Sequence, residues 1–104
     1  MIQIESREQI ESIIENNAVV VMDFYADWCG PCKMLLPVLE RVSVELEDAV
    51  FCKINVDTLS DLAKERAVRS IPTLKLIKDG VEVSTKVGAK NETELIEWVK
   101  GVMG

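Results

Sequence analysis

The chain of 104 residues contains no histidine, and this absence removes several kinds of chemistry at once. Ser-His-Asp and Cys-His catalysis both need an imidazole base, and a His-based metal site needs an imidazole ligand. Any chemistry at this chain must therefore use Cys, Asp, Glu, Lys or backbone groups.

Basic residues are also in the minority, with 12 Lys and Arg against 18 Asp and Glu and a formal net charge of −6. A phosphate-binding surface needs clustered Lys and Arg, so we expect no nucleic-acid partner. No apolar run approaches the roughly 20 residues that span a bilayer, so we expect no membrane partner. The opening segment MIQIESREQI lacks the basic and apolar regions of a secretory signal, and we therefore expect a cytoplasmic protein.

Cysteine is scarce, with three residues where a secreted disulfide scaffold of this size usually carries a larger, even number. The composition, with 48% hydrophobic and 29% charged residues, is that of an ordinary globular protein. No linker or repeat divides the chain. We expect a single domain over residues 1–104 that acts as a monomer.

Strand and helix patterns alternate along the chain. Apolar runs predict strands at residues 2–4, 18–26 and 50–56, and apolar spacing predicts helices after each of them. The second helix begins near the cysteines and runs to about Glu47, with a kink at Pro37.

The C-terminal third follows a different pattern. TLKLIK and VEVSTKV flank Asp79-Gly80, which predicts a two-residue hairpin turn between antiparallel strands. Asn91 and Glu94 then cap a final helix. The predicted order is β-α-β-α-β-α-β-β-α, an α/β fold with a mixed sheet and helices on both faces.

Cys29 and Cys32 are spaced so that both lie on the first turn of the helix that follows the strand at 18–26. Side chains at i and i+3 are close enough for a disulfide. The helix N-terminus stabilises a thiolate at Cys29, so Cys29 is the candidate nucleophile and Cys32 the resolving thiol. Pro31 suits the first helical turn, and Gly30 leaves room for a partner sulfur.

Other interpretations of the cysteine pair are weaker. A disulfide across so short a ring stabilises the fold by only about 2 kcal/mol in the loop-entropy model. A structural zinc site wants four ligands, and one C-x-x-C with a lone Cys52 does not supply them, although a metal or iron–sulfur cluster shared between two chains stays open. Cys52 itself lies in a strand pattern and is expected to pack in the core, without reactivity.

The chain resembles the thioredoxin family. The likeness covers almost the whole chain and rests on DFYADWCGPCK, Pro37, KINVD, SIPTLKLIKDG and VGA, of which WCGPC is highly specific. The resemblance implies the thioredoxin fold, a central mixed five-stranded sheet flanked by four helices. It also implies reduction of protein disulfides without a cofactor or metal, and a flavin- and NADPH-dependent reductase as the partner that restores the dithiol.

The resemblance assigns roles to further residues. Asp23 matches a buried carboxylate beneath the cysteines, and its place on an apolar strand face independently suggests a raised pKa and proton exchange with Cys32. Lys53 matches the lysine beside that carboxylate. Pro72 matches a cis-proline that presents the Ile71 backbone to an extended substrate. The family's flat substrate-binding surface is matched by Trp28, Gly30, Pro31, Ile71, Val87, Gly88 and Ala89.

Two positions depart from the family, because Tyr25 stands where tryptophan is frequent and Cys52 where a small apolar residue is usual.

Two other functions remain open. An oxidase or isomerase of secreted proteins shares the fold, but Gly30-Pro31 resembles the dipeptide of reductants. A binding subunit or scaffold that works without its thiols is the alternative of a different class.

Overall fold

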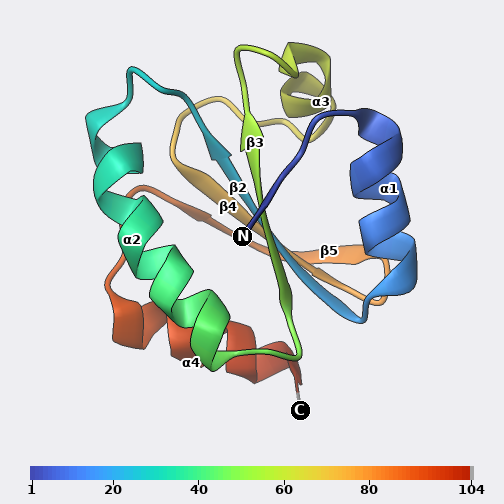
Figure 1. Ribbon diagram of the computed structural model, residues 1–104, viewed down its shortest axis with the longest axis vertical. Helices are drawn as coiled ribbons and strands as arrows, with labels where there is room; N and C mark the ends of the chain where they lie inside the picture. Colours follow the sequence, from blue (N-terminus) through green and yellow to red (C-terminus); the bar gives the residue numbers. More distant parts are fainter. Residues whose placement is uncertain (104) are drawn as a thin grey trace.

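A computed structural model describes residues 1–103 of the chain and confirms the predicted order of elements (Figure 1). The last residue of the predicted domain, Gly104, lies outside the described residues. The elements are β1 (Ile2–Gln3), α1 (Arg7–Asn16), β2 (Val19–Tyr25), α2 (Gly30–Glu45), β3 (Val50–Asn55), α3 (Ser60–Glu65), β4 (Thr73–Lys78), β5 (Val81–Val87) and α4 (Glu92–Met103).

The five strands form one mixed sheet in the order β1-β3-β2-β4-β5. β1 and β2 both run parallel to β3, so the chain reaches each next parallel strand through a crossover helix. β4 runs antiparallel to β2, and β5 antiparallel to β4. The hairpin turn between β4 and β5 falls at Asp79 and Gly80, whose φ angles of 49° and 84° are those of the predicted two-residue turn.

Alternate residues of β2 supply the two faces of the sheet with apolar side chains. Val19 and Val21 join a core cluster with residues of α2 and α4, whereas Val20, Met22 and Phe24 join a second cluster with residues of α1 and α3. Figure 1 shows the same division, with α2 and α4 to one side of the sheet and α1 and α3 to the other. The sequence of a strand that is covered on both faces is a nearly continuous apolar run, and the sequence of β2 has this pattern.

Local signals place the helix ends. The Gln9 N–H donates to the Ser6 hydroxyl at 3.1 Å at the start of α1, and the Glu94 N–H donates to Asn91 Oδ1 at 2.8 Å at the start of α4. Pro37 lies inside α2 without ending it, and the helix stops at Glu45, slightly before the predicted end.

Ile13 and Ile14 of α1 and Val102 of α4 are partly buried and pack against the edges of the two clusters. Along the described part of the chain, no helix is long and apolar enough to cross a membrane.

Candidate functional site

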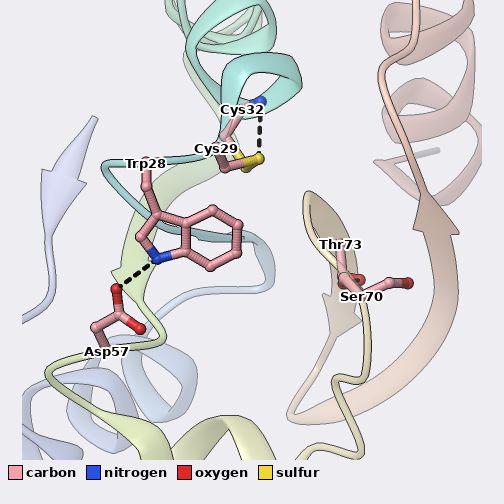
Figure 2. Close-up of a disulfide and its surroundings, with 6 residues drawn as sticks. All are labelled: Trp28, Cys29, Cys32, Asp57, Ser70 and Thr73. Carbon is pink, nitrogen blue, oxygen red and sulfur yellow. Dashed lines mark hydrogen bonds between the residues drawn. A yellow bond between two sulfur atoms is a disulfide. The ribbon is translucent and has the colours of Figure 1, made fainter.

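The cysteine pair lies at the N-terminus of α2, shortly after the end of β2. Cys29 is the N-cap residue of α2 and Pro31 lies in the first turn, as the sequence predicts. The two cysteines form a disulfide with a Cα–Cα distance of 5.3 Å, so the structure represents the oxidised state. The Cys32 N–H donates to Cys29 Sγ at 3.2 Å (Figure 2), which directs a backbone donor of the helix terminus at this sulfur.

In the oxidised state the two cysteines hardly differ in solvent exposure. Cys29 is 5% exposed and Cys32 is 3% exposed, and both pack with Ala26 in a small cluster. Their difference lies in the surroundings, because Cys32 lines a cavity that Cys29 does not line. At Gly30 a β-carbon would meet no atom within 4 Å, so the surface over the disulfide is open at this point.

The cavity beside Cys32, which we call the Asp23 cavity, has a volume of about 260 Å³. It is lined by Asp23, Tyr25, Ala26, Asp27, Cys32, Lys33 and Leu36. The Asp23 cavity therefore gives Asp23 and Cys32 a common space.

Asp23 is 1% exposed, and its Oδ1 has no hydrogen-bond partner among the described residues. Burial raises the pKa of Asp23 to about 7, and the positive charge of Lys53 opposes part of this rise. Lys53 is the register partner of Asp23 in the parallel β2–β3 pair. A carboxyl group with this pKa exchanges protons near neutral pH, which is the property a proton carrier needs.

Across the surface from the cysteines, the Ile71–Pro72 peptide bond is cis, as the family resemblance predicts. Ile71 packs against the cluster of Ala26, Cys29 and Cys32. The Pro72 carbonyl accepts a hydrogen bond from the Gly88 N–H at 2.9 Å, and Gly88 has a φ of 91° that favours glycine. This bond brings the segment of Val87, Gly88 and Ala89 beside Pro72.

Trp28 is the most exposed aromatic residue at the site, with 70% of its surface accessible. Figure 2 shows its indole next to the disulfide, with Nε1 donating to Asp57 Oδ2 at 2.9 Å. Asp57 was not predicted from the sequence as part of the site. Its position just after the end of β3 was the available signal, because ligands of α/β sheets gather at the carboxyl ends of the strands.

A second contact that was not predicted involves Tyr25. Its hydroxyl donates to Gln3 Oε1 at 2.9 Å, and its ring centroid lies 5.7 Å from Lys53 Nζ.

Cys52 is fully buried, and its Sγ donates to the Val21 carbonyl at 3.4 Å. Burial raises the pKa of Cys52 to about 12, with a smaller contribution from the charge of Asp23.

No group of three or more Cys, Asp or Glu side chains within residues 1–103 is arranged to hold a metal ion. A redox-active pair at a helix N-terminus, with a buried carboxyl group beneath it and a cis-proline beside it, defines a thiol–disulfide oxidoreductase.

Comparison with known proteins gives the same class. The Thioredoxin family model matches residues 1–101. A thioredoxin of Chlamydia trachomatis is 43% identical over 99 residues, which are 95% of this chain and 96% of that protein. A thioredoxin of Rickettsia typhi is 42% identical over 88 residues, which are 84% of each chain.

Among solved structures, a mutant thioredoxin of Halobacterium salinarum superposes with a TM-score of 0.94 at 39% identity, covering 99% of this chain and 90% of that one. The chain belongs to the thioredoxin family. It is a protein disulfide reductase that acts by dithiol–disulfide exchange through the Cys29/Cys32 pair, and thioredoxins do this without a cofactor.

Proposed function

We propose that Cys29 is the attacking thiol of this reductase and Cys32 the resolving thiol. The observation that carries this assignment is the contrast in surroundings: Cys29 Sγ accepts the Cys32 N–H at the start of α2, whereas Cys32 shares a cavity with Asp23. A helix N-terminus stabilises negative charge on the attacking sulfur. A nearby carboxyl group serves the thiol that must lose its proton later.

The reaction begins with the dithiol form. The Cys29 thiolate attacks one sulfur of a substrate disulfide, the substrate S–S bond breaks, and the other substrate sulfur leaves as a thiolate that takes up a proton. Cys32 passes its proton to ionised Asp23 and attacks Cys29 Sγ. The mixed disulfide breaks, the second substrate sulfur leaves as a thiolate that takes up the proton held by Asp23, and the Cys29–Cys32 disulfide of the present structure forms. Two electrons pass from the protein to the substrate.

Lys53 assists the proton transfer by favouring the ionised form of Asp23. Its charge is the opposing influence on the pKa of Asp23, although no direct ion pair joins the two groups in the described residues. Without this charge, Asp23 would hold its proton to higher pH and accept one from Cys32 less readily.

The substrate-binding surface surrounds the disulfide. In this proposal Ile71 and Pro72 present backbone groups to an extended substrate segment, since Ile71 packs on the cysteine cluster. The remaining contacts come from Trp28, Gly30, Pro31, Val87, Gly88 and Ala89. Support for their grouping comes from the bond of Gly88 to Pro72 and from the exposure of Trp28.

The cellular setting belongs to the same proposal. The substrates are disulfide-containing proteins, and a flavin- and NADPH-dependent reductase returns the chain to its dithiol form, so that it carries electrons and maintains thiol balance. A reductant of this kind works in a reducing compartment, which favours the cytoplasm. Helices of the same chain cover both faces of the sheet, which supports a monomer and one domain over residues 1–104.

The test is reduction of a model protein disulfide, coupled to NADPH oxidation through a candidate reductase. The wild type is expected to turn over many times, and the Cys29→Ser/Cys32→Ser variant is expected to show no turnover. A Cys52→Ser variant, as the matched control, keeps full turnover because Cys52 is fully buried in the core cluster that packs with α1 and α3. Turnover that survives the double substitution would contradict the proposal.

A further inference from the structure

Three polar side chains lie in a row across neighbouring strands of the sheet. The register pairs Gln3 of β1 with Lys53 of β3, and Lys53 with Asp23 of β2. Two positions earlier on β2 and β3, Val21 and Phe51 pack in the core cluster with α2 and α4. Because side chains alternate along a strand, Asp23 and Lys53 project to this same face.

Tyr25 follows Asp23 by two residues and therefore shares its face. Its hydroxyl donates to Gln3 Oε1 at 2.9 Å, although β3 lies between β2 and β1 in the sheet. The side chain thus crosses the strand that carries Lys53, and the Lys53 ammonium lies 5.7 Å from the centroid of the aromatic ring. A cation at this distance is attracted to the face of a tyrosine ring.

Tyr25 also connects this bridge with the redox centre. It packs against the cluster of Ala26, Cys29 and Cys32. It lines the Asp23 cavity and also a more open pocket, the Gln3 pocket, formed by Gln3, Ile4, Glu5, Tyr25, Asp27, Asn55 and Thr58. One side chain therefore stands between the space that contains Asp23 and the space that opens beside Gln3.

Several charged or titratable groups surround Asp23, and Lys53 is the one that stabilises its ionised form. Burial raises the pKa of Asp23 to about 7, and the charge of Lys53 lowers it. The register partner on the opposite side, in β4, is the apolar Leu74. The other groups are Cys52 from β3, Asp27 after β2, and Cys32 and Lys33 from α2.

We propose that Tyr25 is a positioning residue for proton transfer at Asp23: its bridge to Gln3 holds the Lys53 ammonium on the sheet face that carries Asp23. A partly exposed lysine side chain otherwise turns its ammonium toward solvent, where its charge is screened. The proposal rests on the proposed role of Asp23 in exchanging protons with Cys32. It assigns a function to the tyrosine at the position where tryptophan is frequent in the family.

The test is an NMR titration of the Asp23 carboxyl carbon in the oxidised full-length chain, in which neither motif cysteine titrates. Lys53→Met removes the ammonium charge, so its titration midpoint for Asp23 gives the largest upward displacement, against which the other variants are compared. Tyr25→Phe removes the hydroxyl and keeps the ring, and Gln3→Leu removes its acceptor. Both variants are expected to raise the midpoint by similar amounts, in the same direction as Lys53→Met and by less. Thr58→Val is the matched control, because Thr58 lines the Gln3 pocket and its hydroxyl donates to the Asn55 carbonyl.

A double variant separates positioning of Lys53 from a general effect on packing. If Tyr25 acts through Lys53, Tyr25→Phe causes no further displacement in the Lys53→Met background. The proposal is overturned by an unchanged midpoint in Tyr25→Phe, by a lower midpoint, which indicates water entry, or by an equal displacement in both backgrounds. The titration does not depend on turnover. An Asp23→Asn variant with normal turnover would therefore remove the proposed role of Asp23 and leave the positioning of Lys53 intact.

Discussion

Cys32 and Asp23 line one cavity of about 260 Å³, whereas Cys29 faces the N–H donor at the start of α2. Two sulfur atoms joined by a bond, with nearly equal exposure, thus have different neighbours. In the proposed mechanism, one sulfur is stabilised as a thiolate and the other exchanges a proton with a carboxyl group. This asymmetry is the structural basis for assigning attack to Cys29 and resolution to Cys32.

Asp23 is expected to make the stability of the oxidised protein depend on pH. Its pKa is about 7 in the folded chain against 3.8 as the ordinary value, so the folded state holds the proton more tightly. This contribution to stability is fully present below about pH 4 and is lost as pH rises through about 7. An Asp23→Ala variant removes the loss, which is on the order of 4 kcal/mol.

Urea unfolding of the oxidised wild type and of Asp23→Ala between pH 4 and pH 8 measures this effect. The difference in the free energy of unfolding should grow in favour of Asp23→Ala as pH rises. Asp27→Ala is the control, because Asp27 lines the same cavity but is exposed to solvent. A difference that stays constant across this range would show that Asp23 does not keep its proton on folding.

Cys52 is expected to be unreactive in the native, reduced protein. It is fully buried and burial raises its pKa to about 12, so its thiolate is almost absent at neutral pH. Alkylation at neutral pH followed by peptide mass mapping should label Cys29 first and leave Cys52 unmodified until denaturant is added. Labelling of Cys52 at the rate of Cys29 in the native state would refute this.

Asp23→Asn is expected to slow turnover without slowing the first attack. The amide cannot take a proton from Cys32, whereas the Cys29 thiolate forms at the helix N-terminus without Asp23. Steady-state disulfide reduction should fall by about 100-fold, the lower end of the range for general acid–base catalysis. The alkylation rate of Cys29, measured on the same preparation, should change little. Normal turnover would remove Asp23 from the mechanism.

The bond from Trp28 to Asp57 is expected to orient the indole for substrate binding. Asp57→Ala removes the acceptor and should lower kcat/KM for a protein disulfide by about fivefold, corresponding to about 1 kcal/mol for an exposed hydrogen bond. Asp61→Ala, which removes another carboxylate at the start of α3, is the matched control. Equal kcat/KM in wild type and Asp57→Ala would leave the bond without a role in binding.

Features that depend on neighbours in the sequence were predictable. The hairpin at Asp79-Gly80 requires two residues with positive φ, and this dipeptide accepts them. The caps at Ser6 and Asn91 follow from side chains that reach a backbone N–H three residues later. The run from Ala18 to Ala26 predicted a strand buried on both faces.

Features that join distant segments were not predictable from local pattern. The Trp28–Asp57 and Tyr25–Gln3 bonds each link residues on different strands or loops, so only the register of the sheet brings them together. The cis geometry before Pro72 came from the family resemblance, since local sequence favours a trans bond. The nearly equal exposure of Cys29 and Cys32 depends on how Ala26 and Ile71 pack around both.

The most direct test of the account is trapping of substrates by single cysteine variants in a Cys52→Ser background. Tagged Cys32→Ser and Cys29→Ser proteins are recovered from cell extract and compared on non-reducing gels. Cys32→Ser is expected to accumulate mixed disulfides, because its thiol attacks but no second thiol releases the substrate. Cys29→Ser is expected to trap far less. Equal trapping by the two variants, or none by Cys32→Ser, would contradict the assignment of Cys29 as the attacking thiol.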